Sequence, residues 1–271
     1  MLMFSVTDVS TYLFCPRKLY LYRVLEFEEP PSELLVLGKI NHLMFDQINK
    51  MDKDIVSSIQ EFDPAKIREQ YRKSYFKALK DILNLQKDVI NGVNLKTINI
   101  FHDSWPRFLE ESELRADNVV SFIKNNNIFG KELWEKLTPK YLTEVKLQSE
   151  KLMLRGIVDR IEINEENAIP YEIKTGNPPK EGVWPGHKIQ LIAYMLLAKE
   201  NLGKELNYGY VQYVNTKEKR KIVLNPFSEI EIKNNVEDMK KLLESKEVPP
   251  ILENKNKCNA CNLREQCYGF N

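Results

Sequence analysis

The segment 171-YEIKTG-176, together with 156-GIVDR-160 shortly before it, decides the fold of this chain. Residues two apart in a β-strand project from the same face, so Glu172 and Lys174 point to one side of an otherwise apolar strand. Asp159 ends the preceding predicted strand, and the turn between the two strands is short. An antiparallel pair of strands would therefore bring the carboxylates of Asp159 and Glu172 together.

Two carboxylates that converge at one end of a sheet repel each other unless a positive charge lies between them. A hard divalent cation held by oxygen ligands, Mg²⁺ or Mn²⁺, is the usual arrangement. Lys174 would then stand beside the metal, where its ammonium could orient an attacking water or stabilise charge on a phosphate. The same three residues also fit a surface hairpin with solvated charges, and the short motif alone leaves both interpretations open.

Hydrophobic periodicity predicts a mixed α/β (α+β) core. Period-two patterns indicate strands at 141–149, 151–163 and 168–174, followed by a helix at 187–202 and a hairpin formed by 207–215 and 219–225. Helical spacing predicts further helices at 5–27, 32–50, 63–88, 106–126 and 228–246. This order of elements is typical of a sheet flanked by helices.

A predicted helix directly after the Glu172 strand carries Gln190 and Tyr194. Residues four apart share one face of a helix, so this amide and this phenol are candidates for holding phosphate oxygens or a base near a metal. In isolation, Tyr194 would be interpreted as a core residue. The histidine at the start of the same helix, His187, could touch phosphate, although an incidental position is the favoured interpretation.

Composition limits the classes of protein that fit. The chain has 271 residues, of which 42% are hydrophobic, and it carries a net charge of +1, so any nucleic-acid binding would need a local basic patch. No apolar run approaches the roughly 18 residues of a membrane span, and the N-terminus lacks the features of a signal peptide. We therefore expect a cytoplasmic protein with no membrane partner.

Cysteines gather at the C-terminus as Cys258, Cys261 and Cys267, and the remaining cysteine is Cys15. A Cys-x-x-Cys pair lets two thiolates reach one metal or cluster, and the other two cysteines complete a set of four ligands. Such a site would tie the N-terminal helix to the C-terminal tail, and closing so long a loop predicts a structural role. Spacing alone leaves zinc, an iron–sulfur cluster and four unrelated thiols open.

The motif series resembles the PD-(D/E)xK nuclease superfamily in its RecB-like branch. The resemblance implies a restriction-endonuclease-like core. It implies a metal held by His42, which lies in 38-GKINH-42, Asp159, Glu172 and the backbone carbonyl of Ile173. It implies catalytic roles for Asp159, Glu172, Lys174, Gln190 and Tyr194. Glu144 occupies a position where the family often has a glutamate, which gives it a supporting role.

The opening 15-CPRKLYL-21 and the terminal Cys-x2-Cys-x5-Cys resemble the CRISPR-associated exonucleases of family four, in the iron–sulfur branch. The resemblance implies a 4Fe-4S cluster on Cys15, Cys258, Cys261 and Cys267. It also implies a 5′-to-3′ exonuclease that trims single-stranded DNA or overhangs before a CRISPR-associated integrase inserts them. The alternatives are a DNA repair or recombination nuclease of the same branch, and a non-catalytic zinc-containing DNA-binding protein.

These assignments predict how the chain is divided. We expect N-terminal helices with Cys15 and His42 over 1–50, a helical insertion over 51–140, the nuclease core over 141–246 and a cluster tail over 247–271. Basic and aromatic side chains near the cysteines and the core are candidates for contacting DNA phosphates and bases, namely Arg17, Lys18, Trp184 and Lys257.

Overall fold

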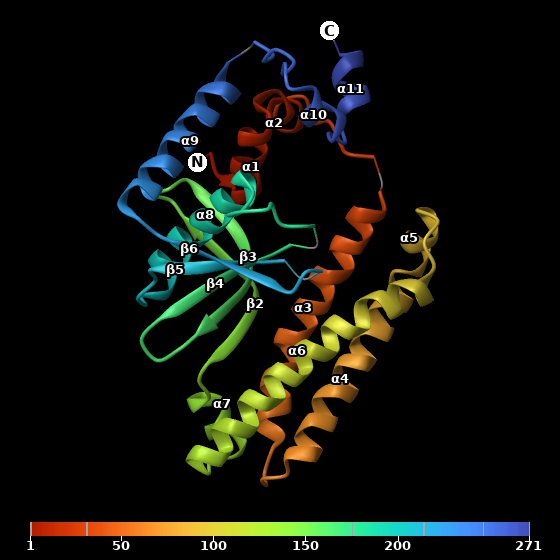
Figure 1. Ribbon diagram of the computed structural model, residues 1–271, viewed down its shortest axis with the longest axis vertical. Coiled ribbons are helices and arrows are strands. Elements are labelled where there is room, and N and C mark those ends of the chain that lie inside the picture. Colours follow the sequence, from red (N-terminus) through yellow and green to blue (C-terminus); the bar gives the residue numbers. More distant parts are fainter. Residues whose placement is uncertain (1, 31, 175, 214, 246, 271) are drawn as a thin grey trace. The chain divides into compact units, whose positions relative to one another are not determined.

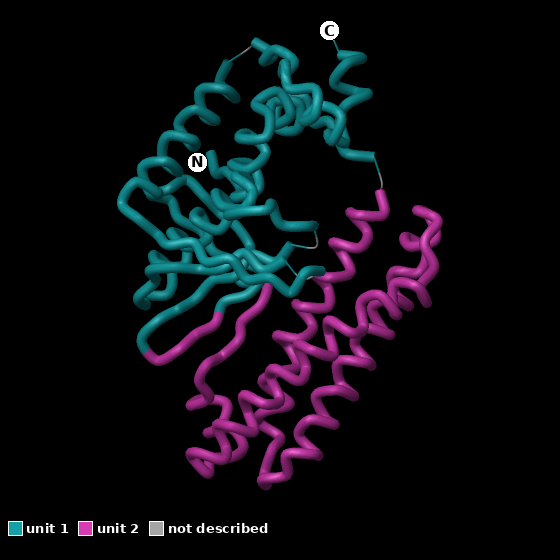
Figure 2. Tube along the Cα trace, in the orientation of Figure 1, with its two compact units in different colours: residues 1–30, 145–161, 166–271 teal, residues 31–144, 162–165 magenta. Residues whose placement is uncertain are grey.

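The computed structural model describes residues 2–30, 32–174, 176–213, 215–245 and 247–270. The chain divides into two compact units, and each unit is assembled from separate segments of the sequence (Figure 2). Unit 1 comprises residues 1–30, 145–161 and 166–271. Unit 2 comprises residues 31–144 and 162–165.

Unit 1 is built on a mixed sheet with the strand order β1-β3-β4-β5-β6, in which β2 also pairs with β3 (Figure 1). β1 runs parallel to β3 and β4 runs parallel to β5, whereas β5 and β6 form an antiparallel hairpin. The strands are β1 Phe4–Ser5, β2 Lys140–Ser149, β3 Leu154–Ile163, β4 Ala168–Lys174, β5 Tyr208–Tyr213 and β6 Glu218–Val223. The ends of β2 and β3 at residues 140–144 and 162–163 belong to unit 2. The predicted mixed α/β fold is confirmed.

Helix α8, Pro185–Leu202, packs on β4 and β5. The missing N–H of Pro185 leaves no helical hydrogen bond unmade in the first turn, and Gly203 ends the helix with a left-handed φ of 58°. Every residue from Ile189 to Ala198 is buried, because the sheet covers one side of the helix and α1 packs against another. This burial fixes the side chains that α8 directs toward β4.

The N-terminal segment forms two helices, so the expectation of one helix over 5–27 is wrong. α1 spans Val6–Phe14 and α2 spans Pro16–Arg23. Cys15 between them is extended, with φ −164° and ψ 113°, because the ring of a proline disfavours helical backbone in the residue before it. The break leaves the Cys15 side chain at the N-terminal cap of α2, where its sulfur accepts from the Lys18 backbone N–H.

The C-terminal part of unit 1 returns to these two helices. α9, Pro226–Glu244, packs against α1 and α2. Two short helices follow, α10 Lys255–Asn259 and α11 Arg264–Gly269. Figure 1 shows this tail beside α2, and hydrogen bonds from Lys257 to the carbonyl oxygens of Leu13 and Phe14 join it to the end of α1. The first and last segments of the chain are therefore neighbours.

Unit 2 is helical. Its helices are α3 Glu33–Ser58, α4 Pro64–Leu85, α5 Lys87–Gly92, α6 Thr97–Asn126 and α7 Gly130–Lys136. The gap between the helices predicted at 63–88 and 106–126 was expected to be a loop, and this is wrong, since α5 and the first turns of α6 occupy it. Pro106 lies inside α6 rather than at its start. The exposed position of Pro106 explains why the helix continues, because water can replace the one backbone hydrogen bond that proline removes.

A buried ion network forms the centre of unit 2. The guanidinium of Arg115 donates to Asp52 Oδ2 at 2.8 Å and to Glu111 Oε1 at 3.0 Å, and its side chain is only 2% exposed. Arg115 also donates to the Tyr141 carbonyl, and the Tyr71 hydroxyl donates to Asp52 at 2.6 Å. These contacts fasten α3, α4 and α6 to the residues that begin β2.

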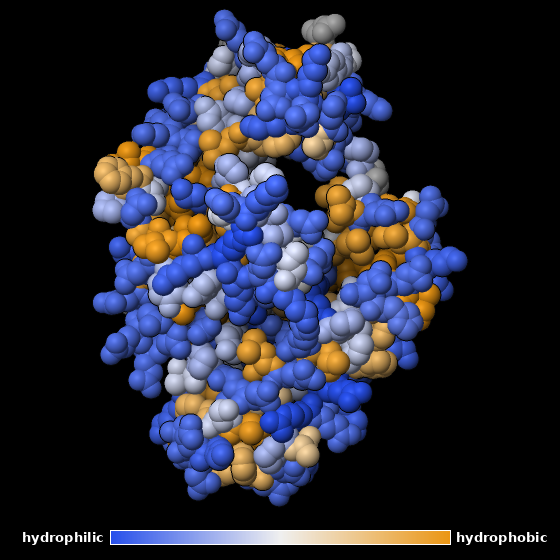
Figure 3. All heavy atoms as spheres, viewed as in Figure 1, coloured by the Kyte–Doolittle hydropathy of each residue, from blue (hydrophilic) through white to orange (hydrophobic). Residues whose placement is uncertain are grey.

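Hydrophilic side chains cover most of the face drawn in Figure 3, and hydrophobic atoms form separate patches on it. The core is apolar: Phe4, Val158, Leu197 and Val211 in unit 1 are fully buried, as is Tyr75 in unit 2. None of the helices in the described part of the chain combines the length and the hydropathy that crossing a membrane requires.

Candidate active site

Strand β4 and helix α8 bring three candidate catalytic side chains together. The Lys174 ammonium lies 2.6 Å from Glu172 Oε1 and donates to Gln190 Oε1 at 2.8 Å. Glu172 is 4% exposed and Gln190 is 7% exposed, whereas the Lys174 side chain retains 23% of its surface. Two buried oxygens thus hold the ammonium in a fixed position at a half-buried site.

Asp159 on β3 contacts the backbone of the neighbouring strand β4. Its Oδ2 accepts a hydrogen bond of 2.6 Å from the Ile173 N–H, between Glu172 and Lys174. The second oxygen of Glu172, Oε2, is buried and has no hydrogen-bond partner among the described residues. An ionised oxygen left in this state is costly, since burial removes its water. Two carboxylate oxygens beside the Ile173 backbone therefore fit the donor set of a hard divalent cation.

Tyr194 lies one turn beyond Gln190 on α8 and is 6% exposed. It packs directly over Gly156 of β3: a Cβ added at that glycine would lie 2.6 Å from the tyrosine ring and 2.9 Å from Val6. Only glycine lets the helix approach β3 this closely. Gly156 in the motif thus sets the height of α8 above the sheet.

A contact between His187 and Tyr213, next to this group, was not predicted from the sequence. His187, in the first turn of α8, has its Nδ1 3.1 Å from the hydroxyl of Tyr213 on β5. Tyr213 is fully buried and is the register partner of Lys174. Burial, and then the charge of Lys174, lower the pKa of His187 to about 4, so the imidazole is neutral at neutral pH. The sequence shows that His187 and Gln190 lie one helical turn apart. It does not show that Tyr213 lies beside Lys174, because that depends on the pairing of β4 with β5.

His42 and Glu144 form a second pair, within unit 2. His42 Nδ1 lies 2.8 Å from Glu144 Oε2, and the histidine side chain is 59% exposed. Glu144 has a φ of 52°, an unusual left-handed backbone for a residue in a strand. Backbone strain of this kind persists where its surroundings impose it, and it aims this carboxylate at the imidazole. A carboxylate that fixes an imidazole in this way is a common support for a histidine that binds metal.

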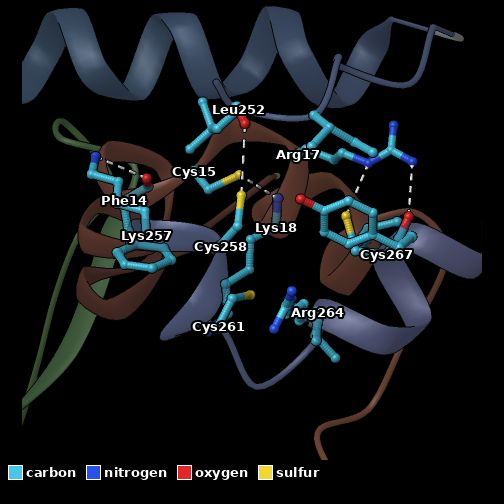
Figure 4. A pocket seen from close by; sticks show the side chains of 14 residues that line it. Phe14, Cys15, Arg17, Lys18, Leu252, Lys257, Cys258, Cys261, Arg264 and Cys267 are labelled. Carbon is cyan, nitrogen blue, oxygen red and sulfur yellow. Dashed lines mark hydrogen bonds between the residues drawn. The ribbon is translucent and has the colours of Figure 1, made fainter. Parts of the chain in front are cut away.

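The four cysteines line one pocket of unit 1, between α1 and α2 on one side and the tail on the other (Figure 4). All four thiols are free and half-buried. Burial raises the pKa of the Cys15 thiol, and the neighbouring Cys261 and Cys267 raise it further. Cysteine thiolates are the usual ligands of structural zinc and of iron–sulfur clusters, so the residue types that line this pocket suit either group.

The predicted DNA contacts have partners within the protein. Arg17 is 7% exposed, and its Nε donates to Cys267 Sγ at 3.2 Å while its other nitrogens donate to backbone carbonyls of the tail. Lys18 pairs with Glu29 at 3.1 Å. Lys257 caps the end of α1, and the half-exposed Trp184 donates to the Asn177 carbonyl at 2.9 Å. Arg17 and Lys257 therefore join the tail to the N-terminal helices.

The family model described as the PD-(D/E)XK nuclease superfamily matches residues 3–268. This chain belongs to that superfamily, so the predicted restriction-endonuclease-like core is confirmed. The matched range includes residues of both units and every candidate catalytic residue considered above.

Similar proteins indicate which branch of the superfamily this chain resembles. A CRISPR-associated exonuclease Cas4/endonuclease Cas1 fusion from Leptospira interrogans is 31% identical over 59% of this chain and 30% of its own length. A CRISPR-associated exonuclease Cas4 from Rhodospirillum rubrum is 28% identical over 46% of this chain and 38% of its own. The predicted resemblance to the CRISPR-associated exonucleases is confirmed by these relatives.

A relative of another kind aligns with more of the chain. The DNA replication ATP-dependent helicase/nuclease JHS1 of Arabidopsis thaliana is 22% identical over 96% of this chain and 20% of its own length. The matches thus span less than two fifths of the length of each of these curated relatives.

Proposed function

We propose that this chain is a metal-dependent deoxyribonuclease that trims single-stranded DNA or single-stranded overhangs. The observation that carries the proposal is the buried Oε2 of Glu172, which has no hydrogen-bond partner in the described part of the chain, on a strand that also presents the Lys174 ammonium and meets the Asp159 carboxylate. The proposed ligands of Mn²⁺ or Mg²⁺ are Asp159, Glu172, the Ile173 carbonyl and His42, with Glu144 holding the imidazole.

In this proposal each side chain has its own task. Bound metal would supply Lewis acidity and lower the pKa of a water molecule. Lys174, held by Glu172 and Gln190, donates to a non-bridging phosphate oxygen as charge builds on it. Gln190 keeps the ammonium in place, and Tyr194 supports the α8 turn that carries Gln190. The neutral His187 adds no charge that would compete with Lys174.

Cleavage of end-labelled single strands, in the presence and absence of Mn²⁺, tests this function. We expect Lys174→Ala to abolish cleavage while the melting temperature stays near that of the parent chain. Lys188→Ala is the matched control, because Lys188 is an exposed lysine on α8. Equal loss of cleavage in both variants, or no metal-dependent cleavage by the parent, would contradict the proposal. Labelling each end in turn tests the proposed 5′-to-3′ direction.

We further propose that Cys15, Cys258, Cys261 and Cys267 hold a 4Fe-4S cluster. The support is their common pocket and the Arg17 N–H directed at Cys267, since hydrogen bonds to sulfur are typical of such clusters. Iron and sulfide assays with a visible spectrum, on protein purified without oxygen, test this. A colourless protein that contains zinc would contradict the cluster proposal and would leave the nuclease proposal unaffected.

The proposed biological setting is CRISPR adaptation, with trimming of prespacers and a CRISPR-associated integrase as partner. The name CRISPR-associated exonuclease Cas4, alone or fused to Cas1, recurs among the relatives and supports it. A repair or replication nuclease is the second candidate, because the JHS1 helicase/nuclease aligns with 96% of the chain. Co-purification of this chain with the integrase encoded nearby, if its gene lies in a CRISPR locus, separates the two.

The predicted division at residues 50, 140 and 246 stays our proposal for how these tasks are distributed. Arg17, Lys18 and Lys257, which line the cysteine pocket, and Trp184, which directly precedes α8, remain proposed DNA contacts. Of these, Trp184 is the most exposed, with 49% of its surface accessible to solvent. Its ring is therefore the best placed to stack on a base.

A further inference from the structure

The sheet of unit 1 has a second face, opposite the one that carries Glu172 and Lys174. Successive residues of a strand point to opposite faces, so Tyr171 points away from the proposed active site. The strand register places Tyr171 beside Tyr210 of β5, and Tyr210 beside Lys221 of β6. Side chains of three strands thus meet on this face.

Aromatic rings and cations alternate across it. The Tyr171 and Tyr210 rings stack with centroids 5.3 Å apart, and Tyr208 meets Tyr210 edge-on at 5.7 Å. The Lys221 ammonium lies 3.9 Å from the centroid of the Tyr208 ring. Arg160 of β3 lies 4.3 Å and Lys219 5.6 Å from the centroid of the Tyr171 ring. We call Tyr171, Tyr208, Tyr210, Lys219, Lys221 and Arg160 the tyrosine–lysine strip.

The outer part of the strip is accessible. Lys219 and Lys221 are exposed, and Tyr208 and Tyr210 are half-buried, so their rings are held while part of each surface meets solvent. By alternation, the other positions on this face of β4–β6 are Ile173, Gln212 and Val223 together with the apolar start of β4, so none is acidic in these described strands. On β3, Glu162 follows Arg160 by two residues and shares its face, so cations outnumber carboxylates here. The face therefore combines π-surfaces with positive charge.

We propose that the tyrosine–lysine strip binds single-stranded DNA, with bases on Tyr208 and Tyr210 and backbone phosphates on Lys219 and Lys221. Stacking of bases on aromatic side chains, beside cations that follow the backbone, is how sheets bind single strands without reading sequence. The strip would hold the strand at a distance from the bond that is cut. The inference takes its ligand from the proposed function, but it concerns binding on a separate face.

Cross-strand tyrosine pairs also stabilise a sheet, so the test must separate binding from folding. The full chain carrying Lys174→Ala is titrated, in EDTA, against a fluorescent oligothymidine single strand at several salt concentrations. Lys219→Gln with Lys221→Gln should weaken binding and reduce the slope of log affinity against log salt by roughly 1.4, the effect of two phosphate contacts. Tyr208→Leu, which keeps an apolar side chain, should weaken binding roughly fivefold or more.

The matched control is Lys240→Gln with Lys241→Gln on α9, which removes the same charge from another surface of unit 1. Melting temperatures are recorded for each variant, and an unfolded variant is replaced by Lys221→Gln alone. If both strip variants bind as tightly as the control, the inference is overturned and a protein partner becomes the better use of this face. Failure of the proposed function is distinct, since it appears as absent metal-dependent cleavage by the parent chain.

Discussion

His187 on α8 and Tyr213 on β5 lie 3.1 Å apart, Nδ1 to hydroxyl, and this contact joins the helix to the strand that pairs with Lys174. The start of α8 is thereby fixed against the sheet one turn before Gln190. The hydroxyl is buried with the tyrosine, so the pair is shielded from competing water.

The pair predicts how stability depends on pH. Burial and the charge of Lys174 lower the pKa of His187 from 6.5 to about 4. Between these values the unfolded chain binds a proton that the folded chain excludes, so stability is complete above about pH 6.5 and falls as the pH drops toward about 4. We expect His187→Gln to reduce the fall in melting temperature between about pH 7 and about pH 5. His102→Gln, which replaces an exposed histidine on α6, is the matched control.

Gln190 is predicted to act on the rate through Lys174. Gln190→Ala removes the oxygen that accepts from the ammonium at 2.8 Å, so Lys174 loses one of its two anchors. The expected result is a roughly ten- to hundredfold lower kcat with a smaller change in KM, because the variant misplaces the Lys174 ammonium without removing a contact to DNA. Steady-state cleavage with Mn²⁺ measures both constants. A variant that changes KM alone would show that Gln190 contacts DNA instead.

Arg17 is predicted to hold the C-terminal tail. Arg17→Ala removes hydrogen bonds to Cys267 and to the carbonyls of Pro249 and Phe270, and should destabilise unit 1 by about 2–4 kcal/mol. Urea unfolding and limited proteolysis of the tail measure the effect. Arg23→Ala on the same helix is the control, because its pair with Asp8 is partly exposed. Equal effects of the two changes would deny Arg17 a special role.

The ion network of unit 2 gives a fourth prediction. Arg115→Ala leaves Asp52 and Glu111 buried without their cation and should cost about 3–5 kcal/mol. Arg68→Ala breaks an exposed pair with Asp117 and should cost at most about 1 kcal/mol. Unfolding curves of both variants test the difference. A small effect at Arg115 would mean that water enters the network and replaces the lost partner.

Local pattern was sufficient to predict the β3–β4–α8 core. Alternation in β4 places Glu172 and Lys174 on one face of the strand, and helical spacing places Gln190 and Tyr194 on one face of α8. The two pairs meet as soon as α8 packs on the sheet. The His187–Tyr213 contact could not be predicted, because it depends on which strand lies beside β4. That choice is made by tertiary packing rather than by any short segment.

The helix errors have a different origin. Helical spacing continues through Cys15 and past Pro106, but one proline breaks the helix and the other does not. Pro16 begins a new helix whose first turn lines the cysteine pocket. Pro106 is exposed, and the carbonyl of the exposed His102, which loses its helical N–H donor to the proline, can accept from water. Arg17 was expected at the surface because arginine usually lies there, and only the returning tail buries it.

The cysteine pocket takes one wall from the beginning of the chain and the other from its end. During synthesis, Cys15 leaves the ribosome on the order of tens of seconds before Cys258, since translation adds roughly 5–20 residues per second. For all of that interval its thiol has no partner cysteine and is open to oxidation. A chain released before residue 251 would lack one wall of the pocket, so this site forms only after residues 251–268 have left the ribosome.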